Sequence, residues 1–165
     1  MQRFNRSALL LFVVVATIVC DQATKALAQR TLSPQPISYL NDLFRLQFAQ
    51  NNGAFLSFGS LLSELARFWI FTILVSIFLL GLLIYLLRIA PHASRLVLSA
   101  LALILGGGVS NLLDRILHKG LVIDFMNIGL GPLRTGIFNV ADMAITSGLV
   151  LLIVHELRTR TRHEE

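Results

Sequence analysis

Charged residues are scarce in this sequence. Asp, Glu, Lys and Arg make up 14% of its 165 residues, whereas hydrophobic residues make up 55%. A soluble domain of this length needs far more polar surface to cover its core. With a mean hydropathy of +0.74, much of the apolar surface is expected to face lipid. The composition therefore excludes an ordinary water-soluble domain, and the length allows one membrane domain over residues 1–165.

Cysteine and clustered histidine are also lacking. Cys20 is the single cysteine, which excludes an intramolecular disulfide bond, and it lies in an apolar run. The four histidines are scattered without zinc-site spacing, so we expect no metal and no cofactor. The net charge of +5 could suggest nucleic acid, but the basic residues flank apolar segments. Membrane orientation explains them better, and we expect no nucleic-acid partner.

Four apolar stretches predict four transmembrane helices. They lie at about 8–28, 68–87, 96–113 and 136–154. Each approaches the roughly 20 residues that span a bilayer once its flanking turns are counted. The first stretch follows Arg3 and Arg6, as in a cleaved signal peptide. The bulky residues before Cys20 disfavour cleavage, so we expect a retained helix.

The distribution of arginine predicts the orientation of these helices. Basic residues occur at the N-terminus, between the second and third helices, and in the C-terminal tail: Arg3, Arg6, Arg88, Arg95, Arg158, Arg160 and Arg162. In a protein with four membrane-spanning helices these regions share one side, which the positive-inside rule makes cytoplasmic. The two longer connections, 29–67 and 115–135, then lie on the opposite side.

Those two connections contain strand-like patterns. The segment Phe44-Arg45-Leu46-Gln47-Phe48 alternates apolar and polar residues, and the favourable hairpin dipeptide Asn52-Gly53 follows it, with Phe55 and Phe58 beyond. Leu121-Val122-Ile123 and Phe125 form a second strand-like stretch. We therefore expect a small β element, at about 38–60 and 120–130, at the outer membrane surface.

Four aspartates lie in or beside apolar segments: Asp21, Asp114, Asp124 and Asp142. A carboxylate at the centre of a membrane helix costs about 2.5–3.5 kcal/mol, so each needs a reason. Asp142 lies near the outer end of a helix whose pattern begins near Gly136; a helix cap is the alternative role. Asp124 has apolar neighbours on both sides, and a turn residue is the alternative there.

The pattern Asn-x-x-Asp occurs twice, as Asn111 with Asp114 and as Asn139 with Asp142. Residues three apart share a helix face, so each amide can donate to the carboxylate and fix its orientation. For Asp114 and the adjacent Arg115 we expect a supporting role as partners in the membrane interface.

Asp21 and Lys25 are four residues apart at the outer end of the first helix. An interfacial ion pair is the expected role, with substrate contact as the alternative. The run Gly106-Gly107-Gly108 is expected to let helices approach closely.

Two carboxylates that face one another share one proton, because both cannot ionise cheaply. The ionised acid can take a proton from water, and the protonated one can polarise a carbonyl, which makes peptide hydrolysis possible without a metal. Intramembrane carboxylates also line the proton pathways of transporters, although usually near the bilayer midplane. A proton-coupled transporter and a purely structural subunit are therefore the competing functions.

Five short segments resemble, in order, the motifs of the lipoprotein signal peptidase (signal peptidase II) family of bacterial membrane aspartyl proteases. They are Asp21-Gln22-Ala23-Thr24-Lys25, Asn51-Asn52-Gly53-Ala54-Phe55, Asn111-Leu112-Leu113-Asp114-Arg115, Val122-Ile123-Asp124-Phe125 and Phe138-Asn139-Val140-Ala141-Asp142. Each is short, but five in order along nearly the whole chain are specific. Ser110, where the family usually has Gly, and Phe55-Leu56, where Ala-Phe is common, depart from the pattern.

The resemblance implies an all-α membrane protein of four transmembrane helices with a small periplasmic β-cradle. It implies cleavage of prolipoproteins before a diacylglyceryl-modified cysteine, at the periplasmic face of the bacterial inner membrane. By motif, the catalytic pair is Asp124 and Asp142. The other motif positions are supporting (Asn111, Asp114, Arg115, Asn139) or substrate-binding (Asp21, Lys25, Asn51, Gly53).

We expect a monomer whose partners are the lipidated substrate and membrane lipid. The residues leave one alternative open. Asp114 lies close to Asp124 in sequence, so either acid could face Asp142.

Overall fold

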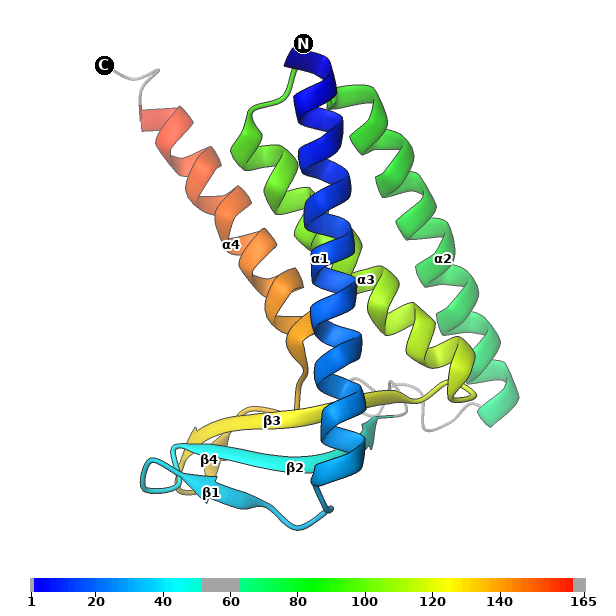
Figure 1. Ribbon diagram of the computed structural model, residues 1–165, viewed down its shortest axis with the longest axis vertical. Coiled ribbons are helices and arrows are strands. Elements are labelled where there is room, and N and C mark those ends of the chain that lie inside the picture. Colours follow the sequence, from blue (N-terminus) through cyan, green and yellow to red (C-terminus); the bar gives the residue numbers. More distant parts are fainter. Residues whose placement is uncertain (1, 52–62, 162–165) are drawn as a thin grey trace.

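The computed structural model describes residues 2–51 and 63–161, which form a helical bundle with a sheet across one end (Figure 1). The helices of this described part are α1 (Gln2–Thr31), α2 (Glu64–Ile89), α3 (Arg95–Leu117) and α4 (Val140–Thr161). Its strands are β1 (Ile37–Tyr39), β2 (Phe44–Asn51), β3 (Val122–Leu130) and β4 (Leu133–Arg134). This arrangement confirms the predicted fold class.

Each of these four helices contains a segment long and apolar enough to cross a membrane. The segments are Arg6–Thr31, Phe68–Ile89, Arg95–Leu117 and Val140–Arg160. Large apolar side chains stay exposed on the outside of the bundle, among them Phe12, Ile77 and Ile153. Exposed side chains of this kind suit a hydrocarbon environment and would be costly in water. Except at the start of α4, the described helices extend beyond the predicted apolar runs because their flanks continue the same helical turns.

Helix α3 lies against each of the other three helices and forms the centre of the bundle. Small residues bring its backbone close to its neighbours. A Cβ atom on Gly107 would stand only 2.5 Å from the carbonyl oxygen of Ala141 in α4, and one on Gly106 would meet Thr17 in α1. This confirms the predicted packing role of the glycine run. The approach also fixes the first turn of α4 against α3.

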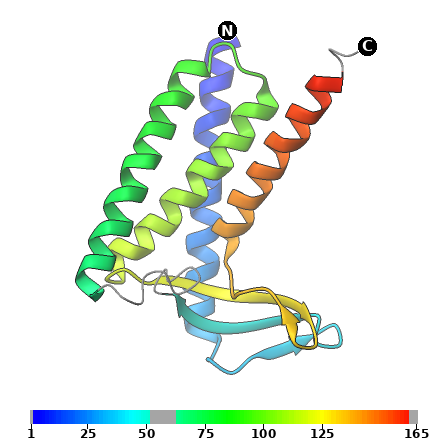
Figure 2. The ribbon, with the colours of Figure 1, turned by 180° about the vertical axis from the view of Figure 1, so that it is seen from behind.

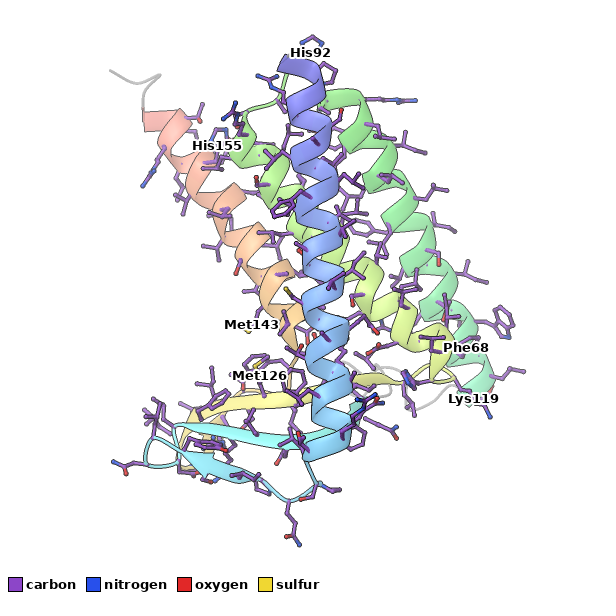
Figure 3. All side chains as sticks on the ribbon, viewed as in Figure 1. Phe68, His92, Lys119, Met126, Met143 and His155 are labelled. Atoms are coloured by element: carbon purple, nitrogen blue, oxygen red, sulfur yellow. The ribbon has the colours of Figure 1, made fainter. Side chains whose placement is uncertain are left out.

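Helix α1 begins and α4 ends at the same end of the bundle, and the sheet lies at the other (Figures 1 and 2). His92 in the connection between α2 and α3 and His155 in α4 lie toward the end remote from the sheet (Figure 3). Met126 in β3 and Met143 in α4 lie where the bundle meets the sheet. The two ends of the molecule therefore differ: one has helix ends and a short connection, the other the β element.

The sheet is antiparallel, with strand order β1-β2-β3-β4. Strands β2 and β3 confirm the two strand-like patterns. Their register pairs Leu46 with Met126 and Ala49 with Asp124, and an irregularity lies between Leu46 and Ala49. Such a bulge changes how a strand presents its side chains. The predicted Asn52-Gly53 turn, with Phe55 and Phe58, lies outside the described residues.

Helix α4 begins at Val140, so the predicted start near Gly136 is four residues too early. The reason is pairing with the sheet. The Phe138 backbone N–H donates to the Met126 carbonyl at 2.8 Å, and the Phe138 carbonyl accepts from the Met126 N–H at 2.9 Å. These bonds hold the chain extended beside β3 up to the residue before Asn139. The helix therefore starts where the sheet ends, and Asp142 falls in its first turn.

Candidate active site

The polar residues singled out by the sequence converge where the bundle meets the sheet. Asp124 comes from β3, Asp142 from the first turn of α4, Asn111 from α3, and Lys25 from the last part of α1. The chain passes from α3 into β3 within a few residues, and from the sheet directly into α4 (Figure 1). The topology thus brings four distant sequence segments to one place.

Asn139 and Asp142 bind one another across the start of α4. The Asn139 side-chain oxygen accepts from the Asp142 backbone N–H at 2.9 Å, and the Asp142 carboxylate accepts from the Asn139 backbone N–H at 3.1 Å. This reciprocal arrangement is a capping box, with Asn139 as the cap and Asp142 at the third helical position. The two residues pair, but not by the predicted bond: the Asn139 side-chain amide donates to Asp124 and not to the Asp142 carboxylate. Asp142 still has an oxygen for a second partner.

That partner is Asn111, whose side-chain amide donates to Asp142 Oδ1 at 2.9 Å. The sequence pattern predicted that Asn111 would hold Asp114 on its own helix. The structure corrects this: the amide crosses from α3 to α4 instead. The side-chain oxygen of Asn111 accepts from Lys25 Nζ at 2.9 Å and from the Asn139 amide at 3.1 Å. The two polar atoms of its side chain therefore link α3 to α1 and to the start of α4.

Asp124 is 2% exposed, and each carboxylate oxygen accepts from an asparagine. Asn139 Nδ2 lies 2.7 Å from Oδ1, and Asn51 Nδ2 lies 3.0 Å from Oδ2. Burial raises the pKa of Asp124 to about 6, and the nearby Asp142 charge acts in the same direction. The hydrogen bonds from both asparagines and the charge of Lys25 oppose that rise in pKa. A carboxyl group with such a pKa can hold or release a proton near neutral pH.

Lys25 binds two buried carboxylates at once. Its Nζ lies 2.6 Å from Asp21 Oδ2 and 2.8 Å from Asp114 Oδ2, and all three side chains are 2% exposed or less. The predicted ion pair between Asp21 and Lys25 is confirmed, but it lies inside the bundle and not at the membrane surface. Buried ions of this kind are stable only when paired and hydrogen-bonded.

Asp114 and Arg115, expected to support the site at the membrane interface, have different partners, and Asp114 is fully buried. Asp114 is 0% exposed and binds Lys25, the Ile123 backbone N–H at 3.0 Å and Gln22 Nε2 at 2.9 Å. Arg115 donates to the Asn111 carbonyl at 3.1 Å. Its charge is near enough to interact with those of the acids at positions 114, 124 and 142.

Two buried polar contacts were not predicted to belong to the site. Gln22 binds Asp114, and Ser110 is fully buried with its hydroxyl 2.7 Å from Asp21 Oδ2. A signal existed for both: each is a polar residue beside an aspartate or asparagine in an otherwise apolar helix. Of the motif residues, Gly53 lies outside the described ranges.

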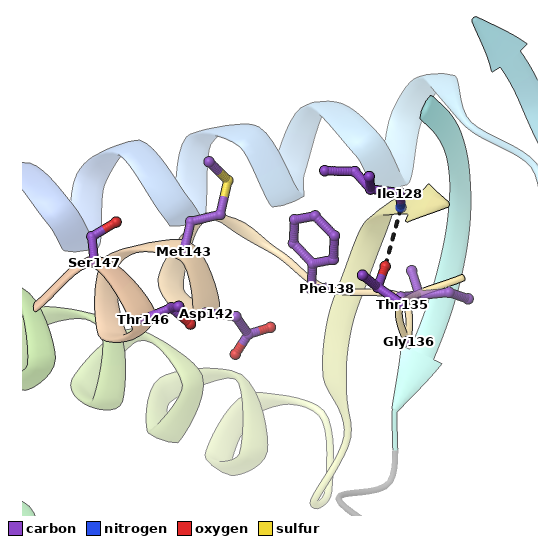
Figure 4. Close-up of a pocket in the computed structure, with 9 residues that line it drawn as sticks. Ile128, Thr135, Gly136, Phe138, Asp142, Met143, Thr146 and Ser147 are labelled. Carbon is purple, nitrogen blue, oxygen red and sulfur yellow. Dashed lines mark hydrogen bonds between the residues drawn. The ribbon is translucent and has the colours of Figure 1, made fainter. Parts of the chain in front are cut away.

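A cavity of about 500 Å³ opens beside Asp142, between α4 and the segment that leads into it (Figure 4). Its lining is mainly apolar, with Phe138 and Met143 close to the acid. The Ile128 N–H donates to Thr135 Oγ1 at 3.1 Å and holds the outer wall together. The full lining is Ile128, Thr135, Gly136, Ile137, Phe138, Asp142, Met143, Thr146 and Ser147. Among residues 2–51 and 63–161, no cluster of three His, Cys, Asp or Glu is placed to hold a metal ion.

The fold and site define a helical membrane protein with two acids at one end of its bundle, the buried Asp124 and the partly buried Asp142. A family model described as Signal peptidase (SPase) II matches residues 13–158, and the chain belongs to this family. Membership makes it a membrane aspartic peptidase of the signal peptidase II type. The resemblance carried by the five sequence motifs is thereby confirmed.

Individual relatives match over almost the whole chain. A lipoprotein signal peptidase of Geobacter sulfurreducens is 38% identical over 151 residues, which are 91% of this chain and 92% of the relative. That of Hydrogenovibrio crunogenus is 37% identical over 155 residues, covering 93% and 88%. A solved structure described as a bacterial membrane enzyme, determined by the in meso method at 1.9 Å resolution, is similar with a TM-score of 0.70. Its sequence identity is 26%, and the match covers 90% of this chain and 92% of that one.

Proposed function

We propose that this protein removes the signal peptides of lipidated prolipoproteins, with Asp124 and Asp142 as its catalytic pair. The observation that carries the assignment is Asn139. Its amide donates to Asp124 at 2.7 Å, while its backbone N–H and side-chain oxygen both bind Asp142. One rigid residue thus holds both acids, from a strand and from a helix. Family membership supplies the class of reaction.

The chemistry needs one proton between the two acids. The ionised acid takes a proton from a water molecule, whose oxygen attacks the peptide carbonyl, while the protonated acid donates to the carbonyl oxygen. The tetrahedral intermediate then collapses: the C–N bond breaks, and a proton passes to the leaving amine. Because the carboxyl groups interact, their protons belong to the pair and not to either residue. The raised pKa of Asp124 fits an acid that can keep a proton near neutral pH.

Asp114 is a poor alternative to Asp124. One of its oxygens accepts from Gln22, and the other accepts from Lys25 and the Ile123 N–H. A carboxylate with three internal partners and no exposure has little capacity left for water. We propose that Asp114 positions the start of β3, and that Asp21 and Lys25 support the site from within, because both are buried.

The position of the acids also disfavours a proton-coupled transporter. Asp124 lies on a strand beyond the bundle, and Asp142 in the first turn of its helix. Transporter carboxylates usually lie near the midplane, between broken helices. A site at one end suits a substrate anchored by its lipid in one leaflet, and the apolar cavity beside Asp142 can accept part of it.

We further propose that the end bearing the sheet faces the periplasm. Arg88, Arg95 and Arg158 lie on the helices at the other end, which the positive-inside rule makes cytoplasmic. A C-terminal green fluorescent protein fusion should then fluoresce, whereas a C-terminal alkaline phosphatase fusion should be inactive. The reverse result would contradict this orientation. The protein is proposed to act as a monomer in contact with membrane lipid.

The test of the catalytic pair uses conservative variants. Asp124→Asn and Asp142→Asn, purified in detergent, should lose cleavage of a diacylglyceryl-modified precursor while keeping their helical circular dichroism. Asp42→Asn is the matched control, because Asp42 lies in the β element and pairs with Arg45 and Arg134. It should cleave normally. Full processing by Asp124→Asn would remove that residue from the pair.

A further inference from the structure

Two buried carboxylates beneath the catalytic pair each hold the backbone next to one of its members. Asp21 Oδ1 accepts from the Ala141 N–H at 2.8 Å, directly before Asp142. Asp114 Oδ2 accepts from the Ile123 N–H at 3.0 Å, directly before Asp124. The position of each catalytic acid therefore depends on a different buried carboxylate.

The two buried carboxylates are joined by two separate connections. The first is ionic, through Lys25. The second is neutral: Gln22 Nε2 donates to Asp114 Oδ1 at 2.9 Å and to Ser110 Oγ at 3.0 Å, and the Ser110 hydroxyl donates to Asp21 Oδ2 at 2.7 Å. Gln22 and Ser110 thus close a ring with Lys25 and the two acids. Gln22 Nε2 also lies 3.3 Å from the Ser110 backbone carbonyl.

We propose that Gln22 and Ser110 form one neutral bridge that positions the catalytic acids relative to each other, an inference that rests on the catalytic pair proposed above. Neither residue lines the cavity beside Asp142, so both act through Asp21 and Asp114 as positioning residues.

This role predicts a specific kinetic pattern. Loss of the bridge lets the two backbone segments shift relative to one another, which slows the chemical step but leaves substrate binding intact. Ser110→Ala and Gln22→Met should each lower kcat about tenfold, equivalent to 1.36 kcal/mol, with KM within about twofold. Because the two residues act as one unit, the double variant should also be lowered about tenfold, and not a hundredfold.

The experiment measures kcat and KM for the full chain in detergent with a diacylglyceryl-modified precursor. Ser99→Ala, on the same helix, is the matched control and should retain the wild-type kcat; Ser99 is not in the ring. Circular dichroism checks the fold of each variant. Gln22 is only half-buried, so Gln22→Met tests the bridge even where Ser110→Ala does not fold.

Independent, additive losses would overturn the proposal, as would an unchanged kcat or an effect confined to KM. The result is separable from the catalytic assignment. If Asp124→Asn kept its activity while the Gln22 and Ser110 losses were non-additive, the catalytic pair would fail and the bridge would stand. If Asp124→Asn were inactive and the losses additive, the bridge alone would fail.

Discussion

Replacing Asp124 with asparagine should remove activity and, above about pH 6, make the fold more stable relative to the wild type. Burial raises the pKa of Asp124 from its ordinary value of 3.8 to about 6 in the folded protein. Between those two values the folded state binds more protons than the unfolded state. Stability therefore falls as the pH rises through this window, because the buried carboxyl group must ionise.

The magnitude follows from the same two values. The pKa difference between 3.8 and about 6, at 1.36 kcal/mol for each pKa unit, corresponds to about 3 kcal/mol. The Asp124→Asn variant has no ionisable group there, so this contribution is absent at every pH. An asparagine at position 124 places an N–H donor near the amides of Asn51 and Asn139, and the protonated carboxyl group of the wild type places an O–H donor there. The free-energy cost of two donors facing each other is therefore similar in the variant and in the protonated wild type, and in the variant it does not change with pH.

The assay is thermal unfolding of wild type and Asp124→Asn in detergent, followed by circular dichroism from about pH 4 to pH 8. The curve of the variant should rise relative to the wild type as the pH increases, by roughly 6–12 °C in Tm for 3 kcal/mol. Asp42→Asn should have the opposite effect on stability. The hydrogen bond from Arg45 lowers the pKa of Asp42, so loss of the Asp42 carboxylate should make the protein less stable than the wild type at neutral pH. Parallel curves for wild type and Asp124→Asn would refute the reasoning.

Two further predictions concern residues around this pair. Asn51→Ala removes a hydrogen bond that lowers the pKa of Asp124, so the acidic limb of kcat/KM against pH should move up by about one pH unit. The control Gln50→Ala, one residue earlier on the same strand, should leave the acidic limb in place. An unmoved limb in both variants would contradict the role of Asn51. Gly107→Ala should lower Tm strongly, because its Cβ would meet a backbone carbonyl at 2.5 Å. Gly108→Ala should lower Tm less, because its Cβ meets only the end of a flexible leucine side chain. Equal Tm values for these two variants would show that the helices separate freely.

The sequence predicted the parts of this structure that depend on composition and local pattern. Four helices follow from runs of apolar residues that must avoid water, and β2 follows from its alternating residues. That Asn139 and Asp142 pair follows from their three-residue spacing, although the bonds are those of a helix cap and not the predicted amide-to-carboxylate bond. The family could be identified because five short motifs occur in order, although none of them is specific alone.

What could not be predicted depends on contacts between distant segments. Neither asparagine amide donates to the aspartate three residues later, as predicted: that of Asn111 crosses to Asp142, and that of Asn139 donates to Asp124. A sequence pattern shows which partners are within reach on one helix, but not which neighbouring helix offers a stronger acceptor. The start of α4 was placed too early for the same reason, because pairing of Phe138 with β3 overrides the helical pattern.

The charges of the site explain why so many acids can lie together. Lys25 offsets one of the two buried carboxylates, Asp21 and Asp114, through contacts of 2.6 and 2.8 Å. Arg115 supplies a second positive charge that interacts with the acids around it. The supporting residues are therefore neutral as a group, and the catalytic pair carries the remaining charge. With one shared proton the proposed pair carries −1, whereas full ionisation would place −2 beside the buried Asp124. Burial of Asp124 and the charge of Asp142 favour the singly protonated pair, and the charge of Lys25 opposes it. We therefore propose that burial retains the shared proton that hydrolysis requires, while the buried network holds the two acids in position.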